Sequence, residues 1–436
     1  MTHLIELKDS AIGIRNTEAE LARSPGFANI ANKAPVFGED ARQMARLHPR
    51  QSFNQFWAQL SLDPLVLKNR FFRHNADLAH SHLQILTQDI DLGDGAILAV
   101  PSHYNRNQLA VLLGIVKQCH FDAVGLVDLS LLQAGASEAE SCIIIDLQLH
   151  QCVLSSFRRV GEHLVRDHVV QIPASGLLTL QDAWCNMITD EFIRQCRFDP
   201  HHNAETEQYI YNQLPQWIEY SARDNEVLAE INHKGTVHQA HLTREQFDQH
   251  GKALYLRIAR ELDTLRTPET TVHTSAANLA LPGLSLHLPG LVTLDDDSSV
   301  STCMHYLDHI RRPSDSLPFI TRLPLVENAM SVPLLQTRQA THVLFRHRAL
   351  PLPAGRLLFG TAPTGLDCAR VVPVPELPAG QALALTRGTR GAKLELHGAA
   401  PQLGDGNSAT DGQPLPLGSL LRLTPKGPDL QLITVE

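Results

Sequence analysis

The chain has 436 residues, of which 43% are hydrophobic and 19% charged, and its formal net charge is −9. This length is enough for two or three packed units with a substantial interior. No run approaches the roughly 20 apolar residues that cross a bilayer, so we expect no membrane span. The acidic balance argues against a nucleic-acid partner, since affinity for phosphate backbones comes from clustered Lys and Arg. The first residues lack a basic segment followed by an apolar one, which favours a cytoplasmic location.

Cysteine and histidine give no sign of a disulfide framework or a metal site. The seven cysteines are scattered without a Cys-x-x-Cys pair, so we expect reduced thiols in the core. The 23 histidines include adjacent pairs such as His201 and His202. Neighbouring side chains on a helix point about 100° apart and cannot chelate one ion together. No His-Glu-x-x-His pattern occurs either, so we expect no metal held by histidines.

The N-terminal part predicts a hairpin and then helices alternating with short strands. Residues 4–7 and 11–14 favour two strands around a turn at 8–10. Residues 38–60 carry apolar side chains at helical spacing, with Pro49 marking a break. The next expected elements are a helix at 77–86, a strand at 96–101, a helix at 105–119, a strand at 123–127 and a helix that starts at 131–136.

A second hairpin is expected to begin with the apolar run at 142–147. Residues 152–157 favour its antiparallel partner, and 165–172 favour a third strand. The chain therefore repeats a β-hairpin unit similar to the one at its start.

Residues 181–266 predict a helix-rich sublobe that follows the second hairpin. A polar strand pair is expected near 225–241. Thr243 and Gln246 have capping-box spacing and predict the start of the last long helix.

The order of these elements resembles the ATPase domain of DnaK-type heat-shock chaperones over residues 3–312. Residues 4–10, Leu-Ile-Glu-Leu-Lys-Asp-Ser, stand where that family has Ile-Asp-Leu-Gly-Thr-Thr. Residues 99–105 are similar to the family's Val-Pro-Ala-Tyr-Phe-Asn segment, and 242–247 to its Thr-Arg-x-x-Phe helix start. Residues 281–289 resemble its adenosine-side Gly-Gly-Ser turn. The resemblance implies a domain 1–312 of the α/β class with a two-lobed, actin-like fold of duplicated ribonuclease-H-like units.

The resemblance also implies which residues would meet a nucleotide. Glu6 and Asp146 keep a carboxylate at the two hairpin entrances, the positions that hold hydrated Mg²⁺ in the family. Asp9, Ser10 and Gln151 belong to the two turns that would face the phosphates. The adenosine side would be formed by Glu219, Arg223 and Gly283.

Both turns depart from the family where it grips phosphate. Backbone N–H groups approach phosphate oxygens in turn conformations that favour glycine, and Lys8 and residues 148–150 replace those glycines. Gln151 stands where the family has threonine, and residues 53–57 lack the lysine that neutralises the transferred phosphate. We therefore name no catalytic residue and expect no resident cofactor. If the site is active, its ligands are ATP and Mg²⁺.

Two further expectations concern the space between the lobes. The glutamate that precedes proline in the family's Asn-Glu-Pro segment aligns with Leu129, and Asp128 lies one position away. Leu149, His150 and Trp57 are expected to fill the cleft where a nucleotide would lie.

The C-terminal part changes composition after residue 312. Residues 313–337 are rich in proline and predict a connector, and 338–436 predict an all-β sandwich domain. Its strand and turn order faintly resembles forkhead-associated modules, which read phosphothreonine with an arginine. Thr361 replaces that arginine, and 404–408 stands in for the module's Gly-Asn-Gly loop. Because arginine contacts dominate such recognition, we favour general protein contact over phosphopeptide reading.

The leading hypothesis is a degenerate DnaK-like pseudo-ATPase that acts as a protein-interaction scaffold or adaptor. Protein partners would bind through the β-sandwich and the two-lobed domain. One alternative is an active Mg-ATP-dependent, chaperone-like ATPase, in which the unusual turns still bind nucleotide. Another is an actin-like structural platform of a secretion or pilus assembly. Fold alone does not decide among them.

Overall fold

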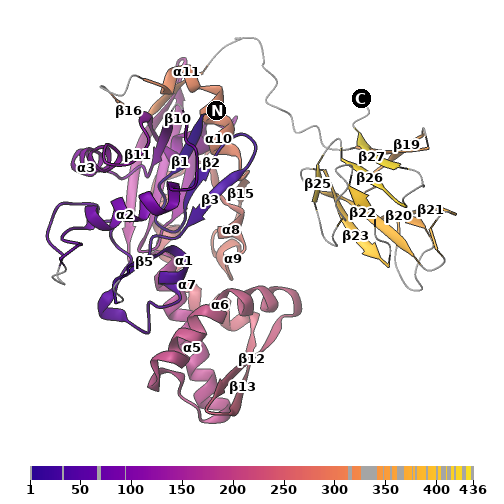
Figure 1. Cartoon of the computed structure of the whole chain (residues 1–436), viewed down its shortest axis with the longest axis horizontal. Helices are drawn as coiled ribbons and strands as arrows, with labels where there is room; N and C mark the ends of the chain where they lie inside the picture. Colours follow the sequence, from indigo (N-terminus) through magenta and orange to yellow (C-terminus); the bar gives the residue numbers. More distant parts are fainter. Residues whose placement is uncertain are drawn as a thin grey trace. The chain divides into compact units, whose positions relative to one another are not determined.

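The chain is a mixed α/β protein in this computed structural model (Figure 1). It divides into two compact units, Met1–Glu327 and Asn328–Glu436. Within the described residues, no helix is both long and apolar enough to cross a membrane. The structure describes residues 2–31, 34–65, 70–93, 95–312, 317–325, 341–346, 348–353, 356–360, 368–375, 377–378, 381–388, 391–398, 401–403, 409, 414–416, 419–424 and 429–433.

A six-stranded sheet begins the first unit, with the strand order β16-β8-β7-β1-β2-β3. The first three strands along the chain pair antiparallel, and the other three extend the sheet in parallel. Helices α2 (Asn75–Thr87) and α3 (Arg106–Val116) share a hydrophobic core with this sheet. The strands are β1 (His3–Glu6), β2 (Ile12–Arg15), β3 (Glu20–Ser24), β7 (Ala96–Val100), β8 (Ala123–Asp128) and β16 (Phe319–Ile320).

A second six-stranded sheet has the order β15-β14-β9-β10-β11-β17. Its first three strands along the chain are again antiparallel, and β14 and β15 again add in parallel. The prediction of a repeated hairpin unit is confirmed by this shared order. The strands are β9 (Ser141–Leu147), β10 (Gln151–Val160), β11 (His163–Pro173), β14 (Thr271–Ser275), β15 (Leu291–Leu294) and β17 (Arg322–Pro324).

Part of the predicted connector belongs to these sheets. Strand β16 pairs with β8 of the first sheet, and β17 pairs with β11 of the second. The apolar residues between the prolines thus complete both sheets. The first unit therefore extends to Glu327, beyond the predicted end of the first domain at residue 312. Short helices of this unit include α4 (Leu129–Ala134), α8 (Ala276–Leu279), α9 (Leu284–His287), α10 (Ser298–His305) and α11 (Leu307–Ile310).

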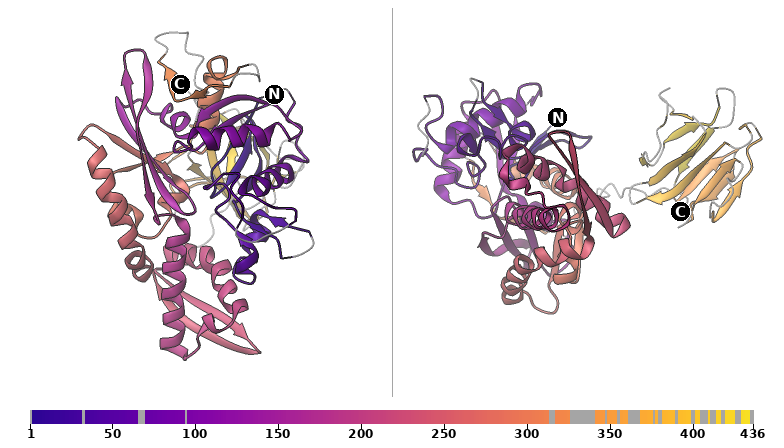
Figure 2. Two further views of the ribbon diagram at one scale, coloured as in Figure 1. Left: turned by 90° about the vertical axis from the view of Figure 1, so that its left-hand side faces the viewer. Right: turned by 90° about the horizontal axis from the view of Figure 1, so that it is seen from below.

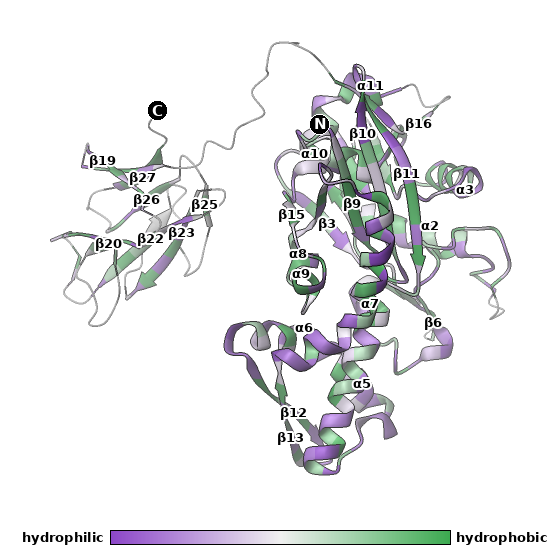
Figure 3. Cartoon of the chain, turned by 180° about the vertical axis from the view of Figure 1, so that it is seen from behind, coloured by the Kyte–Doolittle hydropathy of each residue, from purple (hydrophilic) through white to green (hydrophobic). Residues whose placement is uncertain are grey.

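A helical lobe extends from one end of the second sheet (Figure 2). It contains α5 (Leu177–Cys196), α6 (Ala204–Asp224), α7 (Arg244–Leu265) and the hairpin of β12 (Glu226–His233) and β13 (Thr236–Thr243). Hydrophilic and hydrophobic residues alternate along these helices, as the ribbon coloured by hydropathy shows in Figure 3. The apolar faces enclose a core that includes Trp184, Ile210 and Phe247.

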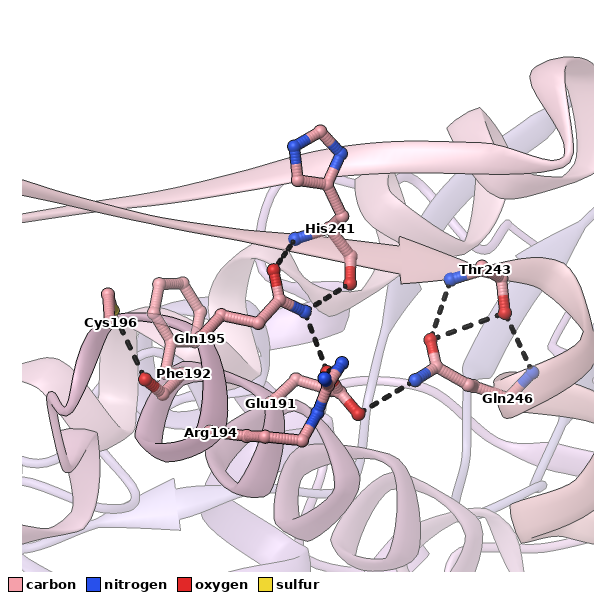
Figure 4. Close-up of polar contacts among 8 residues, drawn as sticks. All are labelled: Glu191, Phe192, Arg194, Gln195, Cys196, His241, Thr243 and Gln246. Carbon is pink, nitrogen blue, oxygen red and sulfur yellow. Dashed lines mark hydrogen bonds and ion pairs between the residues drawn. The ribbon is translucent and has the colours of Figure 1, made fainter.

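Side-chain amides fix the start of α7 and one edge of the hairpin (Figure 4). Thr243 Oγ1 accepts a hydrogen bond from the Gln246 N–H at 3.3 Å, and Gln246 Oε1 accepts from the Thr243 N–H at 2.8 Å. This confirms the predicted capping box. The Gln195 amide donates to the His241 carbonyl and accepts from its N–H, both at 2.8 Å, so it takes the place of a neighbouring strand.

The prediction of a helix over residues 38–60 is wrong beyond its first turn. The structure has α1 (Gly38–Arg42), a 3₁₀ turn at Pro49–Gln51 and a small sheet of β4 (Ala28–Asn29), β5 (Val36–Phe37) and β6 (Ser52–Phe53). Of the apolar residues at helical spacing, Phe56 and Leu60 are buried in irregular backbone, and the others are partly buried. Tertiary contacts hold them there: the Tyr104 hydroxyl donates to the Trp57 carbonyl at 2.7 Å.

The described residues of the second unit form strands in two five-stranded sheets. Their orders are β19-β18-β27-β26-β24 and β21-β20-β22-β23-β25. Phe345 of one sheet and Phe359 of the other share one hydrophobic core. Thr361 and 404–408, which carry the comparison with forkhead-associated modules, lie outside the described residues. The strands are β18 (His342–Phe345), β19 (Arg348–Pro351), β20 (Leu357–Gly360), β21 (Arg370–Val372), β22 (Ala382–Gly388), β23 (Gly391–His397), β24 (Gln402–Leu403), β25 (Pro414–Pro416), β26 (Leu420–Arg422) and β27 (Asp429–Ile433).

Candidate functional site at the two hairpin turns

The candidate site lies where the first strands of the two sheets end. The first turn, residues 7–11, joins β1 to β2, and the second turn, residues 148–150, joins β9 to β10. An ion pair and a backbone hydrogen bond link the two turns. The duplicated topology thus brings together segments that are far apart in the chain.

Lys8 and Asp146 form the ion pair between the two turns. Lys8 Nζ lies 2.6 Å from Asp146 Oδ1, and the side chains are 20% and 10% exposed. Gln148 Nε2 donates to the other carboxylate oxygen of Asp146 at 2.8 Å. Both oxygens therefore have partners from the chain itself, which a buried carboxylate needs. The side chain predicted to hold hydrated Mg²⁺ is paired with a lysine.

Asp9 makes the second link between the turns. Its Oδ1 accepts a hydrogen bond from the Leu149 N–H at 2.9 Å, while the buried Oδ2 has no hydrogen-bond partner in the described structure. The pKa of Asp9 is raised to about 7, mainly by burial and also by the charge of Asp146, while the hydrogen bond from Leu149 and the charge of Lys8 oppose the rise. Asp9 is thus poised to change protonation near neutral pH. Ser10, also predicted for this site, follows in the same turn and is partly buried.

Glu6 faces a different set of partners. The Ser299 hydroxyl of α10 donates to Glu6 Oε1, and burial raises the pKa of this carboxyl group. Nearby, Arg15 Nη2 lies 2.6 Å from Asp297 Oδ1. Glu6 and Arg15 therefore join the first sheet to the segment around α10. The two carboxylates predicted to share a metal are held by different side chains.

Gln151 extends the polar contacts around Asp146. Its Nε2 donates to Gln148 Oε1 at 3.0 Å and lies 3.1 Å from His103 Nε2. Burial lowers the pKa of His103 to about 4, so its imidazole is neutral at pH 7 and can accept this bond. Gln151, at the position where the family has threonine, thus belongs to a network of side-chain hydrogen bonds with Gln148 and His103.

The apolar residue of the second turn packs between parts of both halves. Leu149 is 4% exposed and shares a hydrophobic cluster with Phe27, Ala41 and Leu178. Its neighbour His150 reaches the Asn54 carbonyl at 3.0 Å. Trp57, the third residue expected to fill the cleft, is buried in the core of the first half. The second turn therefore has apolar and polar anchors in the first half.

Helix α5 begins directly against the second turn. The Leu177 N–H donates to the Gln148 carbonyl at 2.8 Å, and the Leu178 N–H donates to the Leu149 carbonyl at 3.0 Å. Gly176 permits this approach, because a Cβ there would lie 2.5 Å from the Leu149 carbonyl oxygen. The first N–H groups of a helix attract anions, and here carbonyls of the chain occupy two of them.

Arg46 makes a further bridge to the helical lobe that the sequence did not indicate. Its Nη2 lies 2.5 Å from Asp182 Oδ1 of α5, and its guanidinium stacks on Tyr211 of α6, 3.9 Å from the ring centre. The Arg46 N–H also donates to Gln208 Oε1 at 2.6 Å. The segment after α1 is therefore fastened to both helices. Such a long-range pair has no local sequence pattern that could reveal it.

Asp128 serves as a buried structural anchor. Its Oδ1 caps α4 by accepting from the Ser130 N–H at 2.9 Å, and its Oδ2 lies 2.6 Å from Arg166 Nη1. The Ser102 hydroxyl donates to the same Oδ1 at 2.6 Å. Burial raises the pKa of Asp128, and Arg166 opposes that rise. The carboxylate next to the position expected for the Asn-Glu-Pro glutamate thus caps a helix and pairs with an arginine.

The three residues predicted for the adenosine side have local roles. Glu219 and Arg223 pair with each other one turn apart on α6, with side chains 58% and 67% exposed. Gly283 precedes α9 with a φ of +77°, a conformation that favours glycine, and lies against Asp248 of α7. None of the contacts found among the described residues joins these three to the two turns.

The predicted residues thus fall into two groups. Asp9, Asp146 and Gln151 come together at the two turns, with Glu6 at the margin of their site. The second group, predicted for the adenosine side, has only local contacts and consists of Glu219, Arg223 and Gly283. Lys8 and His103 are the residues that sequence reasoning missed as partners. Lys8 had one signal, a lysine between two acidic residues at a strand end. No group of three or more His, Cys, Asp or Glu suited to a metal ion occurs in the part of the chain that the structure describes.

No family model matches the sequence, and no curated protein is similar enough to it to count as a match.

Proposed function

We propose that the first unit is an actin-like, DnaK-type fold that has lost its ATPase site and acts in the cytoplasm as a protein-interaction scaffold. The observation that carries this proposal is the Lys8–Asp146 ion pair between the two turns. An ammonium group there supplies the positive charge that Mg²⁺ would otherwise bring to Asp146. Support for the fold comes from the shared order of the two sheets, three antiparallel strands followed by parallel ones.

Two more features favour a scaffold over an enzyme. Leu149 packs with Phe27 and Ala41 where the resemblance expects a glycine that approaches phosphate. The first N–H groups of α5 bind carbonyls of the second turn. The lobes are thus held together by the chain itself, and a bound nucleotide is not needed to bridge them. The C-terminal unit, with strands in two sheets, would serve as a docking domain for proteins.

Thermal unfolding of the full chain with and without millimolar Mg-ATP tests the loss of nucleotide binding. A ligand at a hundredfold excess over its Kd stabilises a protein by about 2.7 kcal/mol. We expect no shift in the unfolding temperature. A clear shift that disappears in Asp146→Asn would overturn the proposal in favour of an active ATPase.

Capture experiments with the full chain test the scaffold role. Partners cross-linked to the purified chain in cell extract should be the same with and without Mg-ATP, since no nucleotide cycle would release them. Partners that leave only when Mg-ATP is added would indicate a working chaperone cycle and contradict the scaffold.

A further inference from the structure

Strand β3 at the end of the first sheet has a free edge beside a cavity. It pairs with β2 and with no other strand in the described part of the chain. An edge strand carries a row of backbone N–H and C=O groups that a further strand can pair with. The edge of β3 is therefore available for another extended backbone.

The cavity next to β3 has a volume of about 330 Å³. Strand residues Leu21 and Arg23 line one side, and Ile85 and Asp89 from α2 and the turn after it line the other. This volume is at the lower end of the range for ligand pockets, roughly 300–1,000 Å³. It suits one or two side chains of a peptide that runs along the strand.

Exposed apolar side chains mark the rim of this cavity. Leu21 is 40% exposed and Ile85 is 47% exposed. The charged side chains on β3 neutralise each other, since Arg23 Nη1 lies 3.3 Å from Glu20 Oε2. Unpaired charges on an edge strand discourage the addition of another strand. An ion pair within the strand does so less, because the two charges offset each other.

We infer that β3 and its cavity bind an extended peptide segment of a partner protein by strand addition, with an apolar side chain seated between Leu21 and Ile85. Main-chain hydrogen bonds supply affinity in this mode, and the pocket selects the side chain. The free backbone groups favour this occupant, because neither a helix nor a small molecule pairs with a strand edge in register. The inference holds whether or not the two turns bind nucleotide.

A peptide selection on the immobilised full chain tests the inference. Phage-displayed random heptapeptides serve as the probe, and the enriched sequence is synthesised and titrated by fluorescence anisotropy. We expect Leu21→Lys and Ile85→Lys each to weaken binding at least tenfold. Val237→Lys, at an apolar position that is 55% exposed in the helical lobe, is the matched control and should leave binding unchanged. Equal loss in all three variants, or no enriched peptide, would overturn the inference.

Methylation of the peptide backbone tests the hydrogen bonds themselves. Successive residues of a strand point their N–H groups to opposite edges. One set of alternate N-methylated positions should abolish binding, while the other set should be tolerated. Tolerance of both sets would exclude strand addition. Light scattering of the free chain tests the competing occupant: a dimer that Leu21→Lys converts to a monomer would assign the edge to a second copy and overturn the inference.

Discussion

Five strands of each six-stranded sheet in the first unit share one order, β8-β7-β1-β2-β3 and β15-β14-β9-β10-β11, but the carboxylates that end their first strands differ. Glu6 of the first sheet accepts from Ser299, within its own surroundings near α10. Asp146 of the second sheet pairs with Lys8 from the other sheet. The duplicated topology sets where both carboxylates lie, and the neighbouring residues decide what each one does. Breaking the Lys8–Asp146 pair should therefore matter more than the loss of an exposed ion pair such as Glu219–Arg223.

The largest effect is expected from Lys8→Met. This variant leaves Asp146 buried without its cation, and breaking a buried pair costs roughly 3–5 kcal/mol. Urea denaturation at pH 7 measures the loss of unfolding free energy. Lys8→Met combined with Asp146→Leu should recover most of it, and a double variant as unstable as Lys8→Met would contradict the assignment.

Asp9→Asn is expected to stabilise the chain at alkaline pH. The folded pKa of Asp9 is about 7 and its ordinary value is 3.8, so the folded state binds the proton more tightly. This contribution to the unfolding free energy is therefore present in acid and declines as the pH rises from about 4 to about 7. Its full size is up to about 4 kcal/mol, since one pKa unit corresponds to about 1.4 kcal/mol.

Asparagine keeps an oxygen for the Leu149 N–H and removes the charge. Unfolding measured between pH 4 and 8 should be flatter with pH for Asp9→Asn than for the natural chain. Asp9→Ala is the control, since it removes both the charge and the acceptor and should gain less. Parallel pH profiles of Asp9→Asn and the natural chain would show that Asp9 ionises normally.

The smallest effect is expected from Arg223→Ala. Its pair with Glu219 is exposed and one helical turn long, so its loss should cost about 0.3–0.5 kcal/mol. The same urea titration measures it, and 1 M salt should remove the difference. A loss of unfolding free energy above about 1 kcal/mol would mean that Arg223 makes stabilising contacts beyond this exposed pair.

Local patterns in the sequence predicted much of the fold. The apolar run at 142–147 is β9, and the Thr243–Gln246 spacing starts α7, because both signals depend on residues close in the chain. The helix prediction for residues 38–60 failed because the conformation of this segment depends on distant partners such as Tyr104. The site shows the same division. Carboxylates at strand ends were visible, but the Asp9–Leu149 contact joins residues 140 positions apart.

Gly176 has a mechanical consequence. Without a side chain there, α5 stands directly on the backbone of the second turn, and two hydrogen bonds fasten it. The helix then runs the length of the lobe and packs against α7 and β13. It can act as a lever arm: a load on the far end of the lobe would be carried to Gln148 and Leu149. From there it would reach the contacts with Lys8 and Asp9, so a protein that pulls on the lobe would strain the link between the two sheets.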